Sequence, residues 1–147
     1  RKNFNGIGID ISKNALKVAK FNAKMHHLEN RVKFFKSSVD NFFKGKYDLI
    51  ISNPPYINKV DFDNFDRGIS KYEPKIALKG GNDGLSLIKK VIKRSSKLLK
   101  KSGKLILEIG YDQKFKVKNL LKNEKFYINK TIKDYGYKSR CIVCTKI

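Results

Sequence analysis

The residues with the clearest chemical potential are Asn53-Pro54-Pro55-Tyr56, which directly follow the apolar run 49–51. Two consecutive prolines fix the backbone φ angle and remove two N–H donors, so the carbonyl groups of this turn stay available as acceptors. The carboxamide of Asn53 and the carbonyl of Pro54 can together hold both hydrogens of a substrate –NH2 group, with its lone pair aimed outward. Tyr56 adds a flat face that can stack on a planar amide or base. An ordinary proline-rich turn is the alternative, but the position at a strand end favours a functional role.

A second candidate is Asp10, which ends an apolar, strand-like segment that begins at Phe4. A carboxylate at the tip of an early parallel strand is the usual partner of a ribose, because its two oxygens can accept from both hydroxyl groups. The alternative is that Asp10 only caps the helix that begins near Ser12. Gly6 and Gly8 lie inside the strand, so they do not form a phosphate-binding loop.

The elements that position these residues are predicted by hydrophobic patterning, which favours an α/β fold with a mainly parallel sheet. Helices are expected from the N-cap Ser12 to about His26, from the cap Asp83 to a stop at Gly103, and over 115–121. The continuous apolar run in the third strand is typical of a strand covered on both faces. Six segments have strand patterns, the last two as an antiparallel pair: 4–10, 31–36, 47–52, 104–109, 126–132 and 140–147.

Composition excludes several classes of protein. The 147 residues are enough for one domain, and a hydrophobic fraction of 40% argues against disorder. Two cysteines cannot form a disulfide framework, and the apolar runs are far shorter than the roughly 18 residues of a membrane span. No signal peptide is visible, so we expect a cytoplasmic protein. The chain begins with Arg1 and enters a strand-like segment almost at once, so we expect a piece of a longer protein.

The net charge of +21 invites a nucleic-acid interpretation, but the distribution of residue types weakens it. Only five of the 34 basic residues are arginines, whose planar fork suits specific recognition better than the point charge of lysine. We therefore expect a weak attraction of RNA or the ribosome to the basic surface, rather than a dedicated groove.

Metal or redox chemistry has two weak candidates. Cys141 and Cys144 form C-x-x-C, but no second pair of ligands accompanies them, so we expect sheet thiols. The adjacent His26 and His27 side chains point apart on a helix. We expect no metal site.

Several segments together resemble the S-adenosylmethionine-dependent methyltransferases with a Rossmann-like fold. More narrowly, the chain is similar to the protein-(glutamine-N5) methyltransferases of the HemK/PrmC family, which modify peptide-chain release factors. Asn-Pro-Pro-Tyr alone is shared with methylases of DNA adenine and rRNA guanine, whereas the block 72–85 is more specific to the glutamine enzymes. The segments that carry the resemblance are Asp10-Ile11-Ser12, Ser52 to Ile57, Tyr72-Glu73-Pro74, Gly80 to Leu85, Leu107 to Gly110, and Gln113.

The resemblance implies S-adenosyl-L-methionine as cofactor, with Asp10 on its ribose hydroxyls and Asn53 also next to it. It assigns the adenine contacts to Ser38 and Val39, with Asp40 as an alternative. The family's glycine-rich loop and first strand would precede residue 1. Residues 1–147 are then a methyltransferase catalytic domain truncated at its N-terminus, which we expect to be inactive alone.

The resemblance also implies the chemistry at the turn. Asn53 and Pro54 would hold the substrate glutamine amide, Pro55 would complete the turn, and Tyr56 would pack against the amide while its nitrogen attacks the methyl group directly. It implies a release factor as partner and supporting roles for Glu73 and Glu108. The basic residue that the family usually has two positions before the Glu-Pro pair is Lys71 here. Two alternatives stay open: an amino-methyltransferase of DNA adenine or rRNA guanine, and a non-catalytic RNA-binding derivative.

Overall fold

The computed structural model describes residues 4–58, 62 and 80–147, which form two compact units. The first unit ends at Phe43 and the second begins at Lys44. The sequence motif around Glu73, together with Lys71, lies outside the described residues. None of the helices in the described ranges is long and apolar enough to cross a membrane.

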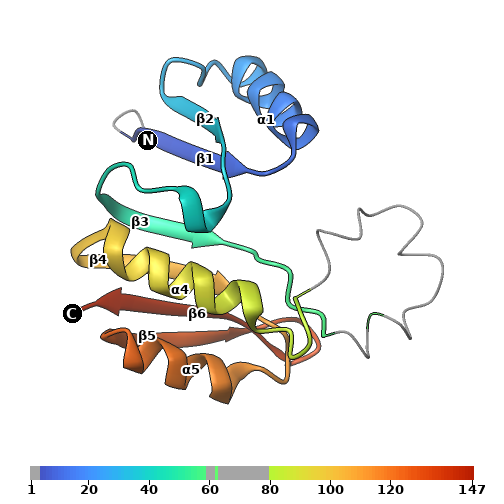
Figure 1. Ribbon diagram of the computed structural model, residues 1–147, viewed down its shortest axis with the longest axis vertical. Helices are drawn as coiled ribbons and strands as arrows, with labels where there is room; N and C mark the ends of the chain where they lie inside the picture. Colours follow the sequence, from blue (N-terminus) through green and yellow to red (C-terminus); the bar gives the residue numbers. More distant parts are fainter. Residues whose placement is uncertain (1–3, 59–61, 63–79) are drawn as a thin grey trace. The chain divides into compact units, whose positions relative to one another are not determined.

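The first unit is a parallel strand pair with a helical crossover (Figure 1). The Ser12 side chain caps the helix by accepting from the backbone N–H of Ala15 at 3.2 Å, as its sequence position predicts. Leu16 and Ala23 are buried, so the apolar stripe of the helix faces inward. The elements are β1 (Gly6–Asp10), α1 (Lys13–Met25), β2 (Val32–Lys36) and the 3₁₀ turn η1 (Val39–Asn41).

The second unit is built on a four-stranded sheet with the order β3-β4-β6-β5. β3 and β4 pair in parallel, whereas β6 lies antiparallel between β4 and β5. The predicted mainly parallel α/β fold with an antiparallel C-terminal strand is thereby confirmed. The elements are β3 (Tyr47–Ser52), α4 (Ser86–Leu98), β4 (Leu99–Glu108), α5 (Lys114–Asn123), β5 (Phe126–Lys133) and β6 (Ser139–Lys146).

The core of the second unit lies between the sheet and the two helices α4 and α5, which cover the same face (Figure 1). Alternate residues of β4 point to this face, as expected for a strand with one buried side. The fully buried side chains come from both layers: Ile88, Ile92, Leu105, Leu107, Val117, Leu121 and Ile142.

The predicted bounds of the long helix are wrong at both ends. Asp83 does not cap it, because the helix begins at Ser86 and the Asp83 carboxylate instead accepts from the backbone N–H of Leu85 at 2.9 Å. Gly103 does not stop it either, because the helix ends at Leu98 and the chain enters β4 directly. The pairing register between β3 and β4 shifts at this entry, so the turn around Gly103 belongs to an irregular strand start.

The prediction that β3 is covered on both faces is also wrong for the part of the chain that is described. Leu49 is 45% exposed and Ile51 is 68% exposed, while Ile50 between them is half-buried. The reason is that α4 and α5 cover one face of the sheet, and β3 is an edge strand. Within the described ranges, β1 and β3 lie in separate sheets and do not pair with each other.

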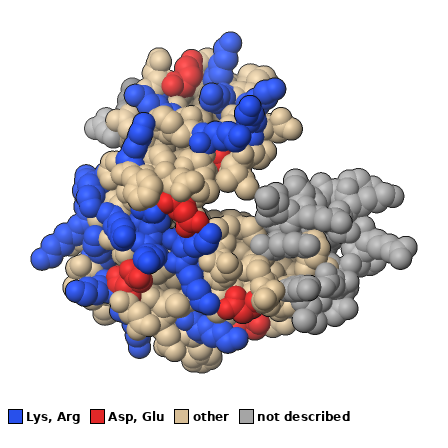
Figure 2. All heavy atoms as spheres, viewed as in Figure 1, with Lys and Arg blue, Asp and Glu red and all other residues tan. Residues whose placement is uncertain are grey.

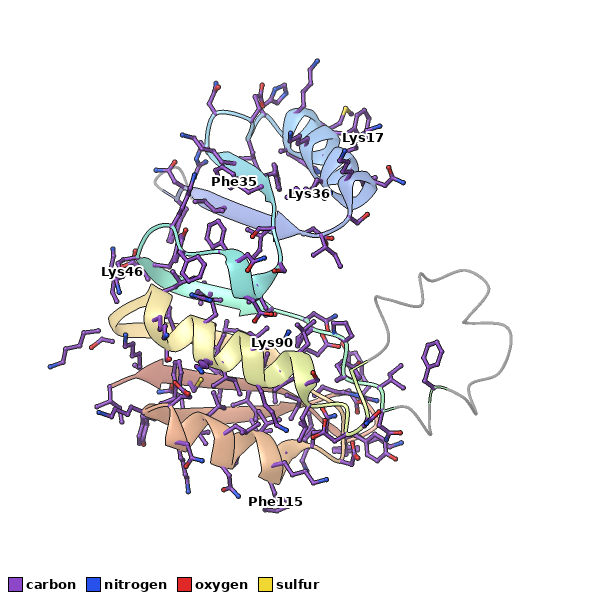
Figure 3. The ribbon with its side chains drawn as sticks, viewed as in Figure 1. Lys17, Phe35, Lys36, Lys46, Lys90 and Phe115 are labelled. Atoms are coloured by element: carbon purple, nitrogen blue, oxygen red, sulfur yellow. The ribbon has the colours of Figure 1, made fainter. Side chains whose placement is uncertain are left out.

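The positive charge is distributed over both units. In Figure 2 the Lys and Arg side chains occur on each unit of the visible face instead of gathering in one band. Several cations are engaged locally: Lys89 pairs with Asp83 at 3.0 Å, and Lys100 pairs with Asp48 at 2.8 Å. In Figure 3, Phe115 projects outward from α5 at 76% exposure, so apolar side chains also reach this surface.

The one-sided sheet predicts a sharp contrast between its two faces. Replacing Leu105, which is 0% exposed, by Ala should lower the free energy of unfolding by about 2–5 kcal/mol, because it leaves a cavity under α4 and α5. Ile51→Ala, on the exposed face, is the matched control and should cost about 1 kcal/mol or less. Urea denaturation of the full-length protein measures both, and equal losses would show that the exposed face is covered in solution.

Candidate active site

The turn Asn53–Tyr56 leaves the carboxyl end of β3, where its sequence placed it. The last pair of the β3–β4 ladder is Ser52 with Leu107, so Asn53 and Glu108 both follow at the same edge of the sheet. The Asn53 side chain is exposed, whereas Pro54 is buried and anchors the turn. Among the described residues, neither the Asn53 carboxamide nor the Pro54 carbonyl has a hydrogen-bond partner. Both acceptors therefore remain available to a ligand.

The Tyr56 side chain is fixed by a carboxylate on the neighbouring strand. Its hydroxyl donates a hydrogen bond to Oε1 of Glu108 at 3.2 Å. Burial raises the pKa of the Tyr56 hydroxyl above its usual value, the charge of Glu108 and this bond raise it further, and the Arg140 guanidinium partly opposes them. Tyr56 is therefore a neutral donor at physiological pH, and Glu108 has the supporting role that the resemblance implied.

The backbone of Tyr56 is held by Gln113, a residue whose role the sequence did not indicate. Gln113 is 5% exposed, and its Nε2 donates to the carbonyl oxygens of Tyr56 at 2.9 Å and Gly84 at 3.2 Å. Its Oε1 accepts from the backbone N–H of Gly110 at 3.0 Å. A buried glutamine just after the β4 end was the available signal, because a buried amide needs partners for its donors and its acceptor.

The β5–β6 hairpin adds a small group of charged and aromatic side chains. Nε of Arg140 donates to Oδ2 of Asp134 at 2.8 Å, and this bond lowers the pKa of the Asp134 carboxyl. Nζ of Lys138 lies 4.9 Å from the centre of the Tyr111 ring, and Cζ of Arg140 lies 5.8 Å from it. Tyr111 itself is 57% exposed, so the ring is a surface feature next to the end of β4.

Asp10 ends β1 in the first unit and is half-buried. Its Oδ1 accepts from the backbone N–H of Ser12 at 2.7 Å, and its backbone carbonyl accepts from that of Ser37 at 3.1 Å. Oδ2 has no partner among the described residues. One oxygen of the carboxylate thus supports the helix start, and the other is available to a ligand. The geometry is compatible with both interpretations of Asp10, the helix cap and the partner of a ribose.

Ser38 and Val39 directly follow Ser37, whose backbone N–H donates to the backbone carbonyl of Asp10. Ser38 precedes the 3₁₀ turn that Val39 begins, and both residues are half-buried. Asp40 lies in the same turn. The structure thus brings the predicted ribose and adenine contacts to the carboxyl end of one strand pair, while the turn residues Asn53–Tyr56 belong to the second unit.

The two cysteines are free thiols of β6. Cys144 is fully buried, and burial raises the pKa of its thiol to about 12. Burial also raises the pKa of the half-buried Cys141. Across the described ranges, no group of His, Cys, Asp and Glu side chains has the arrangement of a metal site.

Comparison with known proteins decides the family. The sequence model of the family described as "Methyltransferase domain" matches residues 1–142. This chain belongs to that family.

Relatives of this methyltransferase domain carry more specific names. A protein of Fusobacterium nucleatum named "Release factor glutamine methyltransferase" is 40% identical over 143 residues, which are 95% of this chain and 40% of the relative. A protein of the same name from Buchnera aphidicola is 40% identical and covers 98% of this chain and 51% of the relative. "Ribosomal protein uL3 glutamine methyltransferase" from Francisella tularensis is 46% identical over 106 residues, which are 71% of this chain and 33% of the relative. The chain spans between 33% and 51% of the length of these relatives.

Solved structures agree with the methyltransferase fold. The ribosomal protein L11 methylase from Lactobacillus delbrueckii subsp. bulgaricus has a TM-score of 0.68 at 19% identity, covering 97% of this chain and 58% of that protein. An S-adenosylmethionine-dependent methyltransferase from Clostridium acetobutylicum has a TM-score of 0.65 at 12% identity, covering 97% and 75%. The predicted Rossmann-like methyltransferase sheet is therefore confirmed.

The contact between Tyr56 and Glu108 predicts a measurable titration. Glu108→Gln keeps an acceptor at Oε1 but removes the negative charge, so the pKa of Tyr56 should fall and leave mainly the part that burial causes. NMR titration of ¹³C-labelled tyrosine measures this shift in the full-length protein. Glu124→Gln removes an equal charge on the helix side and should leave the Tyr56 titration unchanged; equal curves for all three proteins would contradict the contact.

Proposed function

We propose that the protein transfers a methyl group from S-adenosyl-L-methionine to the side-chain amide nitrogen of a glutamine in a peptide-chain release factor. The observation that carries the proposal is a pair of acceptors, Asn53 and Pro54, without hydrogen-bond partners among the described residues. They lie on a turn whose last residue, Tyr56, is fixed at its hydroxyl and its carbonyl. Two neutral acceptors suit a neutral –NH2 group, which has two hydrogens to donate. The names of the relatives support a glutamine amide over a nucleic-acid base.

The first unit offers a partner for the cofactor. Oδ2 of Asp10, which has no partner in the described part of the chain, is a carboxylate acceptor at a strand end and suits a ribose hydroxyl. Ser38 and Val39 directly follow Ser37, whose backbone N–H donates to the backbone carbonyl of Asp10, and they can border the adenine. These residues therefore fit the nucleoside part of S-adenosyl-L-methionine.

The chain's own residues contribute mainly position. When bound, the cofactor supplies a methyl group that its sulfonium already activates. Asn53 and Pro54 accept the two amide hydrogens, which aims the nitrogen lone pair away from both acceptors. Tyr56 packs along the amide plane, and its neutral hydroxyl stays on Glu108. After the methyl group has moved, the nitrogen loses one of its two protons to solvent. No general base is therefore needed before transfer, and orientation provides most of the acceleration.

A second protein substrate is supported by one relative. The Francisella protein that is 46% identical is named for a glutamine of ribosomal protein uL3, and its match covers 71% of this chain. The same acceptor pair would serve a glutamine amide in either substrate.

Methyl transfer from radiolabelled cofactor tests the proposal in the full-length protein. Release factor should be labelled, and a release factor with its target glutamine replaced by Glu should not be. Labelling of uL3 instead would favour the second substrate, and labelling of DNA or rRNA alone would overturn glutamine methylation in favour of a nucleic-acid amino group.

Asn53→Ala tests the acceptor pair. It should remove about 2–4 kcal/mol of transition-state stabilisation, which lowers turnover roughly 30- to 800-fold, because one of two acceptors is lost. Cofactor affinity should change much less. The exposed Asn119→Ala on α5 is the control for the substitution itself, and near wild-type turnover of the Asn53 variant would remove the role given to this residue.

Asp10 is tested with two variants, because it also contacts Ser12. Asp10→Asn keeps an acceptor for the Ser12 N–H but loses the charge, and Asp10→Ala loses both. Both should weaken cofactor binding in calorimetry, since a charge-assisted bond to the ribose is lost. If Asp10 only supports the helix start, Asp10→Asn will bind the cofactor as tightly as the wild type.

A further inference from the structure

Gln113 connects the turn Asn53–Tyr56, called the acceptor turn below, to two other segments of the second unit. We propose that Gln113 is a positioning residue: it fixes the backbone of Tyr56 and through it holds the acceptors of Asn53 and Pro54 in place. The proposal rests on the proposed function in that it takes this turn as the binding site of the acceptor amide.

The contacts of Gln113 use the whole amide group. Nε2 donates its two hydrogens to the carbonyls of Tyr56 and Gly84, and Oε1 accepts from the backbone N–H of Gly110. The three partners come from the acceptor turn, the segment before α4 and the end of β4. One buried side chain therefore links three segments that lie far apart in the sequence.

Two glycines of the segment before α4 lie close to the backbone of Tyr56 and Ile57. The N–H of Gly80 donates to the carbonyl of Ile57 at 2.8 Å. A Cβ atom on Gly80 would lie 2.9 Å from the carbonyl carbon of Tyr56, and one on Gly84 would collide with the Tyr56 oxygen. Gly84 has a φ of +68°, which a side chain disfavours. The Tyr56 carbonyl group thus lies close to both glycines and accepts a hydrogen bond from the Gln113 amide.

The Gln113 side chain bonds to neighbouring segments and does not cap its own helix. It occupies the N-cap position of α5, yet its side chain makes no capping bond there. Asn, Asp, Ser or Thr would stabilise the helix start better at this position. The longer glutamine side chain reaches the Tyr56 carbonyl instead, so its hydrogen bond stabilises the turn and not the helix start.

Two variants separate positioning from general stability. Gln113→Met keeps the length and burial of the side chain but removes all three hydrogen bonds. Val117→Ala is the control. Val117 is fully buried one turn further along α5, and its apolar side chain forms none of the hydrogen bonds that hold the acceptor turn. Gln113→Met should lower kcat on release factor about 10- to 100-fold with the dissociation constant of the cofactor unchanged within about twofold. Val117→Ala should lower the melting temperature without this selective loss.

Combination with Asn53→Ala tests whether Gln113 acts through the turn. If it does, adding Gln113→Met to the Asn53 variant should lower kcat by less than about threefold more, because the positioned acceptor is already absent. Losses that multiply would overturn the proposal. Gln113→Glu gives an independent check: only its protonated carboxyl can donate to Tyr56, so its kcat should recover relative to wild type as the pH falls.

Hydrogen exchange keeps the test independent of the substrate. In Gln113→Met the amides of Tyr56, Ile57 and Gly80 should exchange faster, while those of β6 keep wild-type protection. Unchanged exchange at the turn would overturn the proposal. If wild-type protein methylates neither release factor nor uL3, the proposed function fails, and this measurement still decides whether Gln113 fixes the turn.

Discussion

The parallel pairing of β3 with β4 is the constraint on which the second unit depends. Because Ser52 lies opposite Leu107, the two strands end at the same edge of the sheet, which places Asn53 and Glu108 there. The pairing is held from one side by the packing of α4 and α5 on fully buried residues such as Leu105 and Leu107. A shift of this register by one residue would exchange the buried and exposed faces and also separate Glu108 from Tyr56. Core packing and site geometry are thus set by the same ladder.

Sequence reasoning succeeded where local pattern and tertiary structure agree. The β3 run was predicted at its observed bounds, and Ser12 caps α1 as a serine at that position should. It failed where a residue has two possible partners. Asp83 has a side chain suited to a helix cap, but it lies too far before the first helical residue, Ser86. Its carboxylate instead accepts from the backbone N–H of Leu85 and from the Lys89 ammonium group. Gly103 had the chemistry of a helix stop, but Leu98 ends α4 because Leu99 already pairs with Tyr47.

The candidate site was predicted mainly from residues whose types suit a ligand. Of the residues that hold them, Glu108 was expected only through the resemblance, and the role of Gln113 was not predicted. Asn53 and Tyr56 were recognisable because their types and their place after a strand suggest binding. The bond from Tyr56 to Glu108 and the three bonds of Gln113 join residues that lie 29 to 57 positions apart or share a turn. Such partners follow from the strand order, which spacing alone does not give. The exposure of Leu49 and Ile51 has the same origin, since an apolar run does not reveal which of its faces a helix covers.

The exposed state of the Asn53 carboxamide has an energetic consequence for recognition. Under the proposed function, this solvent-exposed group exchanges water for the incoming amide and gains only the net value of each exchanged hydrogen bond, about 0.5–1.5 kcal/mol. Two such exchanges correspond at most to millimolar affinity for an isolated glutamine side chain. Selectivity for a substrate at cellular concentration therefore has to come from the folded surface that surrounds its target residue. The proposed function therefore assigns amide binding to the turn and the choice of the substrate protein to an extended protein–protein contact.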